Sequence, residues 1–328
     1  MRDKPVSILT LLGVIAVSSF LIGSFATCET SAQDSYTGQW IIAPARTADR
    51  YQVTFTYRSA RMGRGHSMSG FTIEPDRLQG LTQAQVMSAG SRVQFQLVRD
   101  AGTLNCEGWF KDGKGSGHFV FAASPTFAAE LQRRGYQAPT EPQQFSMTLS
   151  DLSLVLIDEL KTQGYERPSL DQLVRMGEHG VTSEYIRELK GLGYSVQSVD
   201  LLTKMVDHGV SPRFIRELDA LGFKQLPVET LVRTVDHGVT PRFITELAAA
   251  GYTGLSLDQL IRTVDHGVTP KFIVELKEIG YDKLPIEQLV RMQDHGVTVK
   301  FIQKMRSRGF NDASIDELIR LADHGMNN

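Results

Sequence analysis

The sequence predicts an α+β fold in which an N-terminal antiparallel β-meander domain at residues 35–122 is followed by an all-α helical-hairpin solenoid at residues 124–326. The β domain is predicted from short segments in which apolar and polar residues alternate, the period of a half-buried strand. The solenoid is predicted from a repeat of 29 residues that continues without a slip to the end of the chain. A fixed period of about 20–50 residues is typical of stacked supersecondary units.

Residues 1–32 have the organisation of a secretory signal peptide. Arg2 and Lys4 precede an uncharged run at residues 5–28, and small residues that suit signal cleavage follow. A membrane anchor is an alternative, because about 20 apolar residues can span a bilayer, and lipidation at Cys28 is a third interpretation. All three export the rest of the chain, so we expect a periplasmic or otherwise exported protein, or one anchored in the inner membrane with its bulk outside the cytoplasm.

Charge and cysteine content exclude several classes of protein. The formal net charge is −2 and the isoelectric point is near 6.5, which does not favour binding to nucleic acid or to an anionic membrane surface. Cys28 and Cys106 are the only cysteines, and cleavage of a signal peptide would leave Cys106 alone. No disulfide framework is then available, and the stability of the fold has to come from packing.

Short strands and turns account for the β domain. Residues 51–57 and 93–97 alternate strictly, and residues 104–110 and 117–121 are two further strand candidates. Glycine-containing turns between these segments favour hairpins. Residues 76–88 predict one short helix. The expected product is a meander, a small sandwich or an open barrel.

Two near-motifs in this domain resemble catalytic or phosphate-binding loops. Gly65–Gly70 is similar to a nucleophile elbow, but its second glycine comes one residue too late. Gly113–Gly117 is similar to a phosphate loop, but it is too short and no helix follows it. We interpret both segments as flexible hairpin connections.

The unit Thr240–Val268 illustrates how one repeat encodes two helices. Thr240 suits a helix N-cap and a proline follows it at the first helical position. Gly251 is expected to end that helix in a left-handed conformation, followed by an aromatic residue as in a Schellman cap. Ser256 and Gln259 then form a capping box for a second helix, whose apolar face is predicted from the residues Leu257, Leu260, Ile261 and Val264.

Seven such units follow one another: residues 124–152, 153–181, 182–210, 211–239, 240–268, 269–297 and 298–326. Helices of about ten residues are unstable alone in water, so each unit must bury its apolar faces against its neighbours. The first unit lacks the His-Gly pair and the first helix of the last unit is basic. Terminal units with altered outer faces are what a solenoid needs for solubility.

An acid and a histidine recur near the end of the second helix in every unit except the first. We interpret the histidines mainly as structural caps of helix C-termini, with partner contact, pH sensing and metal binding as alternatives. The acids oppose the helix dipole there, and the basic residues three positions earlier are the expected source of compensation. A salt-bridged ladder between units and a charged stripe that docks a partner are both open interpretations. The candidate contact residues are Arg175, Lys204, Arg233, Asp236, His237, Arg262, Asp265, His266, Arg291, Asp294 and His295.

The string His-Gly-Val-Thr-Pro-x-Phe-Ile-x-Glu-Leu occurs at His237–Leu247 and at His266–Leu276. It resembles the tandem helical repeats of exported bacterial proteins, which are similar to repeats appended to membrane zinc peptidases of the beta-lactam-sensor type. The resemblance covers the solenoid from about residue 124, and a β domain often accompanies such repeats. The sequence contains no His-Glu-x-x-His motif, so the peptidase chemistry is not implied, and the resemblance assigns no activity.

We therefore expect a non-catalytic exported scaffold or sensor that binds a protein or peptide along the solenoid and needs no cofactor or metal. Membrane contact is expected only through an uncleaved N-terminal segment. The alternative is binding of a small molecule or an envelope component by the β domain, near Trp40, Trp109 and His118. A hydrolase that uses Ser67 with His66 or His118 is a third interpretation, and we do not favour it.

Overall fold

The computed structural model describes residues 36–46, 49–58, 66–196 and 198–326, and residues from Tyr36 onward cluster as one unit. The predicted signal peptide and its alternatives at residues 1–32 lie outside the described residues. Within the described ranges, no helix combines the length and the apolar character needed to cross a bilayer.

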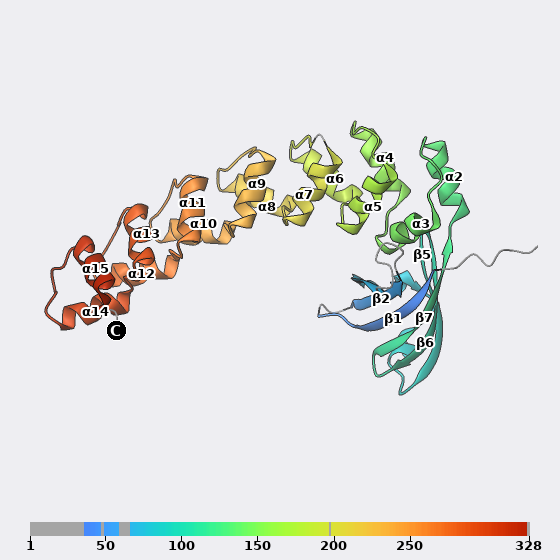
Figure 1. The fold of residues 1–328 in the computed structure, drawn as a ribbon, viewed down its shortest axis with the longest axis horizontal. Helices are drawn as coiled ribbons and strands as arrows, with labels where there is room; N and C mark the ends of the chain where they lie inside the picture. Colours follow the sequence, from blue (N-terminus) through green and yellow to red (C-terminus); the bar gives the residue numbers. More distant parts are fainter. Residues whose placement is uncertain (1–35, 47–48, 59–65, 197, 327–328) are drawn as a thin grey trace, which may run out of the picture. The chain divides into compact units, whose positions relative to one another are not determined.

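The predicted β domain is a single antiparallel sheet (Figure 1). Its strands are β1 (Thr37–Pro44), β2 (Tyr51–Arg58), β3 (His66–Ile73), β4 (Leu78–Gln79), β5 (Ser91–Arg99), β6 (Gly102–Lys111) and β7 (Lys114–Ala123). The strand order is β3-β2-β1-β7-β6-β5-β4. The sequence predicted β2, β5, β6 and β7, whereas β1, β3 and β4 were missed. The helix predicted at residues 76–88 is only the short α1 (Gln83–Val86), preceded by a 3-10 turn and by β4.

The interpretation of the two near-motifs needs a correction. Residues 66–70, read as part of a flexible connection, lie in strand β3 and pair with β2. The second near-motif does begin at a tight turn, where Gly113 has a φ of 82°. Its remaining residues belong to β7, because Gly115 and Gly117 pair with both β1 and β6.

One face of the sheet forms a core of aromatic and aliphatic side chains. Trp40 is fully buried, and its indole N–H lies 3.1 Å from the carbonyl oxygens of both Glu107 and His118. Gly108 and Gly117 pair across β6 and β7 beneath this ring. A Cβ at Gly108 would come within 2.6 Å of the indole, so the missing side chain makes room for Trp40.

The fourteen described helices from α2 to α15 form seven hairpins, one in each predicted repeat (Figure 1). The bounds are α2 Pro125–Arg133, α3 Glu141–Leu149, α4 Leu154–Thr162, α5 Leu170–Glu178, α6 Ser183–Gly191, α7 Val199–Asp207, α8 Pro212–Ala220, α9 Val228–Asp236, α10 Pro241–Ala249, α11 Leu257–Asp265, α12 Pro270–Glu278, α13 Ile286–Asp294, α14 Val299–Ser307 and α15 Ile315–Leu321. First helices contact the first helices of neighbouring repeats, and second helices contact second helices.

The predicted caps are confirmed. The Thr240 hydroxyl accepts a hydrogen bond from the N–H of Phe243 at 3.1 Å, and Ser256 and Gln259 form a complete capping box. Gly251 has a φ of 99°, and the following N–H of Tyr252 donates to the carbonyl of Leu247 at 2.9 Å. These contacts satisfy backbone groups that short helices would otherwise leave unpaired.

The apolar face predicted for the second helix is confirmed, and Thr263 is an additional buried position in it. In α11, Leu260 and Ile261 are buried, and Leu257 and Val264 are half-buried and pack against the same core. The Thr263 hydroxyl donates to the carbonyl of Gln259 at 2.6 Å, which satisfies its polar atom inside the core. The hydrogen bond explains why a polar residue can occupy this position.

The first repeat belongs to the core of the sheet as much as to the solenoid. Phe145 of α3 is 1% exposed and packs against aromatic rings of the sheet. Its ring centroid lies 4.7 Å from that of Tyr36, 4.8 Å from Tyr57 and 5.2 Å from Phe121. The sheet therefore uses a helix of the first repeat to cover its inner face.

Polar contacts fix the same junction. The guanidinium of Arg99, at the end of β5, donates to the last carbonyls of α3, those of Thr148 at 2.6 Å and Leu149 at 2.7 Å. Asp151 lies 3.3 Å from Arg99, and burial lowers the pKa of Arg99 to about 10 although Asp151 opposes this effect. The next residue, Asp100, accepts a hydrogen bond from the first N–H of α4 at 2.9 Å. The β5–β6 hairpin thus caps one helix and starts the next.

Candidate functional site: the charged ladder and the grooves between repeats

The recurring histidines and acids form one ladder that crosses five repeat boundaries. Each histidine Nδ1 lies against the aspartate of the following repeat, 28 positions later. The pairs are His179–Asp207 (2.5 Å), His208–Asp236 (2.6 Å), His237–Asp265 (2.8 Å), His266–Asp294 (2.5 Å) and His295–Asp323 (2.7 Å). The ladder between repeats exists, but its basic partner is histidine and not the predicted arginine.

The geometry of the helix end produces this pairing. His237 is the C-cap residue of α9, where its backbone N–H donates to the carbonyl of Arg233. The cap uses only the backbone of His237, so the imidazole ring can turn toward the next repeat. There it meets Asp265, the last residue of α11. A carboxylate opposes the negative end of the helix dipole, and an imidazole N–H beside it offsets that cost. The predicted cap role is thus corrected: each histidine ring contacts a carboxylate of the neighbouring repeat.

The same offset of 28 residues governs two other rows of contacts. In the first helices, Arg216 lies 3.1 Å from Glu188 of the preceding repeat. At the start of the second helices, the side-chain amide of Gln172 donates to Asp200 at 3.3 Å. Neighbouring repeats are therefore held in register by matched polar pairs along both layers of helices.

The basic residues predicted to compensate the acids have different roles. Arg233 contacts Asp258 and Arg291 contacts Asp316 at 2.8 Å, each at the start of the next second helix. Arg175, Lys204 and Arg262 are exposed on the corresponding positions of other repeats. The predicted residues Asp236, His237, Asp265, His266, Asp294 and His295 all belong to the ladder, with the imidazole and the carboxylate of each pair turned to one another.

Within the described part of the chain, the ladder does not bring three metal-binding side chains together. Among residues 36–46, 49–58, 66–196 and 198–326, no three His, Cys, Asp or Glu side chains converge on a common point. Each rung supplies one imidazole and one carboxylate, whereas tight metal sites require three or four ligands. What the ladder can do is stabilise the contact between repeats.

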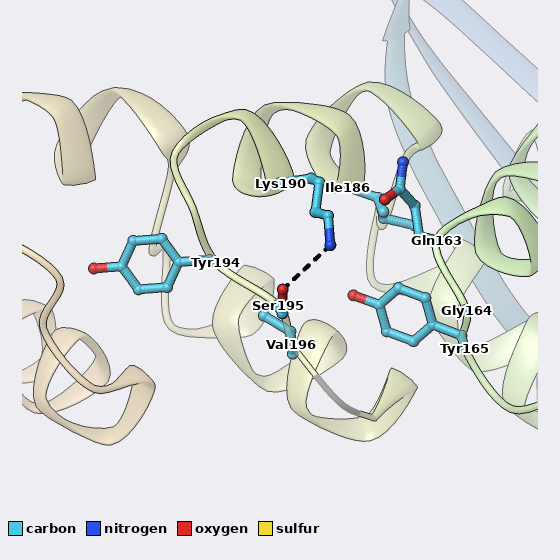
Figure 2. Close-up of a pocket in the computed structure, with 8 residues that line it drawn as sticks. All are labelled: Gln163, Gly164, Tyr165, Ile186, Lys190, Tyr194, Ser195 and Val196. Carbon is cyan, nitrogen blue, oxygen red and sulfur yellow. Dashed lines mark hydrogen bonds between the residues drawn. The ribbon is translucent and has the colours of Figure 1, made fainter.

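The sequence did not predict a groove between the first repeats. Tyr165 lines two hollows, one of about 540 Å³ on the side of Tyr136 and one of about 190 Å³ on the side of Tyr194. Figure 2 shows that Tyr165 and Lys190 point into the smaller hollow, whereas the ring of Tyr194 points away from it. The Lys190 ammonium donates to the Ser195 hydroxyl at 3.3 Å. We call the two hollows together the Tyr165 groove.

The recurring Gly-aromatic pair is the signal that could have located this groove. Tyr136, Tyr165 and Tyr194 each follow the glycine that ends a first helix. An aromatic side chain therefore recurs at the equivalent position of successive repeats. Burial raises the pKa of the Tyr165 phenol, which therefore remains neutral at ordinary pH. Because the phenol is neutral, it can donate a hydrogen bond to a ligand in the groove.

The residues proposed for a β-domain site are not all on one surface. The side chain of Trp40 lies in the core, whereas Trp109 and His118 are exposed on the opposite face of the sheet, and all three residues line one hollow. Ser67 lines a hollow beside α3, and His118 lies on that opposite face. The structure thus does not bring Ser67 and His118 together. The side chain of His66 lies outside the described residues.

Comparison with models of protein families, with curated proteins and with solved structures finds no match for this chain.

Proposed function

We propose that this chain is a non-catalytic exported scaffold or sensor whose solenoid binds a protein or peptide partner. Stacked repeats present an extended surface, and solenoid proteins usually bind their partners along such a surface. The observation that carries the proposal is the Tyr165 groove, where two adjoining hollows share one half-buried aromatic side chain. An extended segment of a partner could follow this groove across the first three repeats.

The lining of the groove indicates the chemistry of the partner. Lys190 and Arg167 contribute positive charge, and the Arg167 guanidinium lies 5.7 Å from the centre of the Tyr136 ring. Asp158 is already occupied, since Arg134 binds it at 2.8 Å. Tyrosine and arginine are enriched among residues that dominate binding energy. We therefore expect a partner segment with an acidic group for Lys190 and an apolar side chain for Tyr165.

The exposed basic side chains form a second set of candidate contacts. Arg175, Lys204 and Arg262 lie at equivalent positions one or two repeats apart and are open to solvent. The histidine–aspartate pairs are less suited to contact a partner, because each carboxylate already faces an imidazole of the same chain. In this proposal, the ladder maintains the register of the repeats and the groove binds the partner.

Site-specific photo-crosslinking tests the proposal. A photoreactive residue in place of Lys190, in the full-length protein, should capture a defined set of envelope proteins or peptides. Tyr165→Ala should remove most of this capture because the groove loses its central contact. Val155→Ala is the matched control, since Val155 is a 59% exposed side chain of α4 that does not line the groove. Equal capture by all three proteins would refute the groove as the binding site.

A further inference from the structure

The outer face of the sheet, opposite to the core, carries two complete rows of exposed side chains across strands β1, β7, β6 and β5. One row contains Gln39, His118, Glu107 and Gln94. The next row contains Ile41, Ser116, Trp109 and Arg92. All eight are exposed, and helix α3 packs only on the inner face. We call these two rows the outer face.

Trp109 is the unusual feature of the outer face. Its side chain is 54% exposed in the middle of a sheet, whereas the other tryptophan, Trp40, is completely buried. The indole of Trp109 lies beside Gly90, where an added Cβ would meet Nε1 at 3.3 Å. Ile41, 56% exposed, belongs to the same row. Large exposed apolar side chains that cluster on a polar surface mark interaction sites.

The charges of the outer face are balanced and most of its polar groups are neutral. Arg92 and Glu107 carry opposite charges, and the remaining polar side chains are amides, a hydroxyl and an imidazole. In the adjacent row, the side-chain amide of Gln96 donates to that of Asn105 at 2.7 Å. Each of these amides keeps a further donor or acceptor. This surface complements a neutral ligand that is rich in hydroxyl or amide groups.

Two shallow hollows make the outer face continuous. A hollow of about 630 Å³ surrounds Trp109 and a second of about 700 Å³ surrounds Asn105, and Glu107 and His118 line both of them. These volumes fall within the range of about 300–1,000 Å³ that is typical of sites for small ligands. The hollows therefore offer adjoining positions to a ligand built from linked units.

We infer that the outer face is a binding site for a neutral, β-linked oligosaccharide. The C–H groups of a pyranose ring carry partial positive charge and stack on the negative face of an indole. The hydroxyl groups around the ring would exchange hydrogen bonds with the amides, with Glu107 and with His118. Chains of pyranoses with equatorial β-1,4 linkages are flat and extended, which matches a sheet surface. The site is separate from the Tyr165 groove, so each proposal can fail without the other.

Tryptophan fluorescence of the full-length protein tests this inference directly. The chain has two tryptophans, one buried and one on the outer face, so a ligand can change the accessibility of only Trp109. Titration with chitohexaose or cellohexaose should shift the emission to the blue and protect it from acrylamide, with a dissociation constant below about 1 mM. Comparison of the two sugars shows whether N-acetyl groups contribute to binding.

Variants assign the binding to the proposed surface. Calorimetric titration of Trp109→Ala should show at least about tenfold weaker binding, and Trp109→Phe should be intermediate because it keeps an aromatic face. Val155→Ala, an exposed apolar side chain on α4, should bind like the parent protein, and circular dichroism should show all variants folded. The inference is overturned if neither sugar binds, or if Trp109→Ala binds as tightly as the parent.

Discussion

The first repeat and the interior repeats have the same helical hairpin but are held by different interactions. The first repeat places Phe145 against the rings of the sheet, and two of its carbonyls accept hydrogen bonds from Arg99. Among the described residues, these contacts with the sheet belong to the first repeat alone. Repeats further along use the same pairs again and again, such as His208–Asp236 and His237–Asp265. We therefore expect the interior repeats to be exchangeable, because each meets an almost identical neighbour, whereas the first repeat fits only one surface.

Deletion of whole repeats should give the largest difference between the two regions. Removal of residues 240–268 joins repeat four to repeat six and brings His237 against Asp294, a pair of the same kind. We expect a folded protein with lower stability, because the stability of a solenoid is roughly a sum over repeats and boundaries. Removal of residues 124–152 exposes the inner face of the sheet, and we expect aggregation. Circular dichroism and size-exclusion chromatography distinguish the outcomes.

A second deletion, which shifts the register of the repeats, is the control for this test. Deletion of residues 240–267 removes one residue less than a full repeat and shifts every later column by one position. The polar pairs are offset by 28 residues, so this change places His237 against a residue other than the aspartate. We expect it to be much more destabilising than the 29-residue deletion. Similar melting of the two deletion variants would show that the ladder does not set the register.

Phe145→Ala should destabilise the protein by about 3–5 kcal/mol, the range found for large aromatic side chains in a core. Phe145 is 1% exposed and contacts rings from several strands, so the cavity cannot close easily. Phe214→Ala in α8 should cost less, since that ring is only half-buried. Urea unfolding followed by fluorescence of the buried Trp40 gives the midpoint for both variants. Equal losses of stability in the two variants would contradict the proposed difference between the first repeat and the interior repeats.

The buried thiol of Cys106 should make the stability of the sheet sensitive to alkaline pH. Burial raises the pKa of this thiol from 9.0 to about 12, so the folded state keeps the proton that the unfolded chain releases. The stabilisation is complete below pH 9.0 and is lost as the pH rises toward about 12. Between about pH 8 and about pH 10 the unfolding free energy should fall by about 1 kcal/mol from this group. Urea unfolding at both pH values measures it.

Cys106→Ala is the control for this alkaline effect. The variant has no thiol to titrate, so its stability should fall less between the two pH values, whatever its stability at the lower one. Other groups, such as the buried tyrosines, titrate in both proteins and cancel in the comparison. An identical pH dependence of parent and variant would contradict the role of Cys106.

The sequence predicted the repetitive part of the fold much better than the unique part. Local rules determine where Thr240 starts a helix and where Gly251 ends it, and these rules recur in every repeat. The β domain offered fewer signals: β1 and β3 lack strict alternation over their length and were missed. The position of Phe145 in the core of the sheet depends on tertiary contacts that no local pattern contains.

The sequence also predicted some parts of the candidate sites and not others. The columns of His237 and Asp236 were visible in the sequence, but their pairing depends on how far one repeat is displaced along the next. An offset of 28 residues instead of 29 decides that histidine, and not arginine, meets the acid. Trp109 was recognised as a candidate, whereas only the strand register shows that Trp40 points to the other face.

A single rung of the ladder should give the smallest effect. In the pair His237–Asp265, both side chains are about 40% exposed, and exposed polar pairs of this kind typically contribute about 0–1 kcal/mol. A double-mutant cycle with His237→Ala and Asp265→Asn should show a coupling energy of about 0.5 kcal/mol that decreases with salt. His237→Ala combined with Asp294→Asn is the matched control, because these residues are two repeats apart and should not couple. The total effect of the ladder then comes from its repetition, since five weak pairs at successive boundaries all favour one register over a shift by a residue.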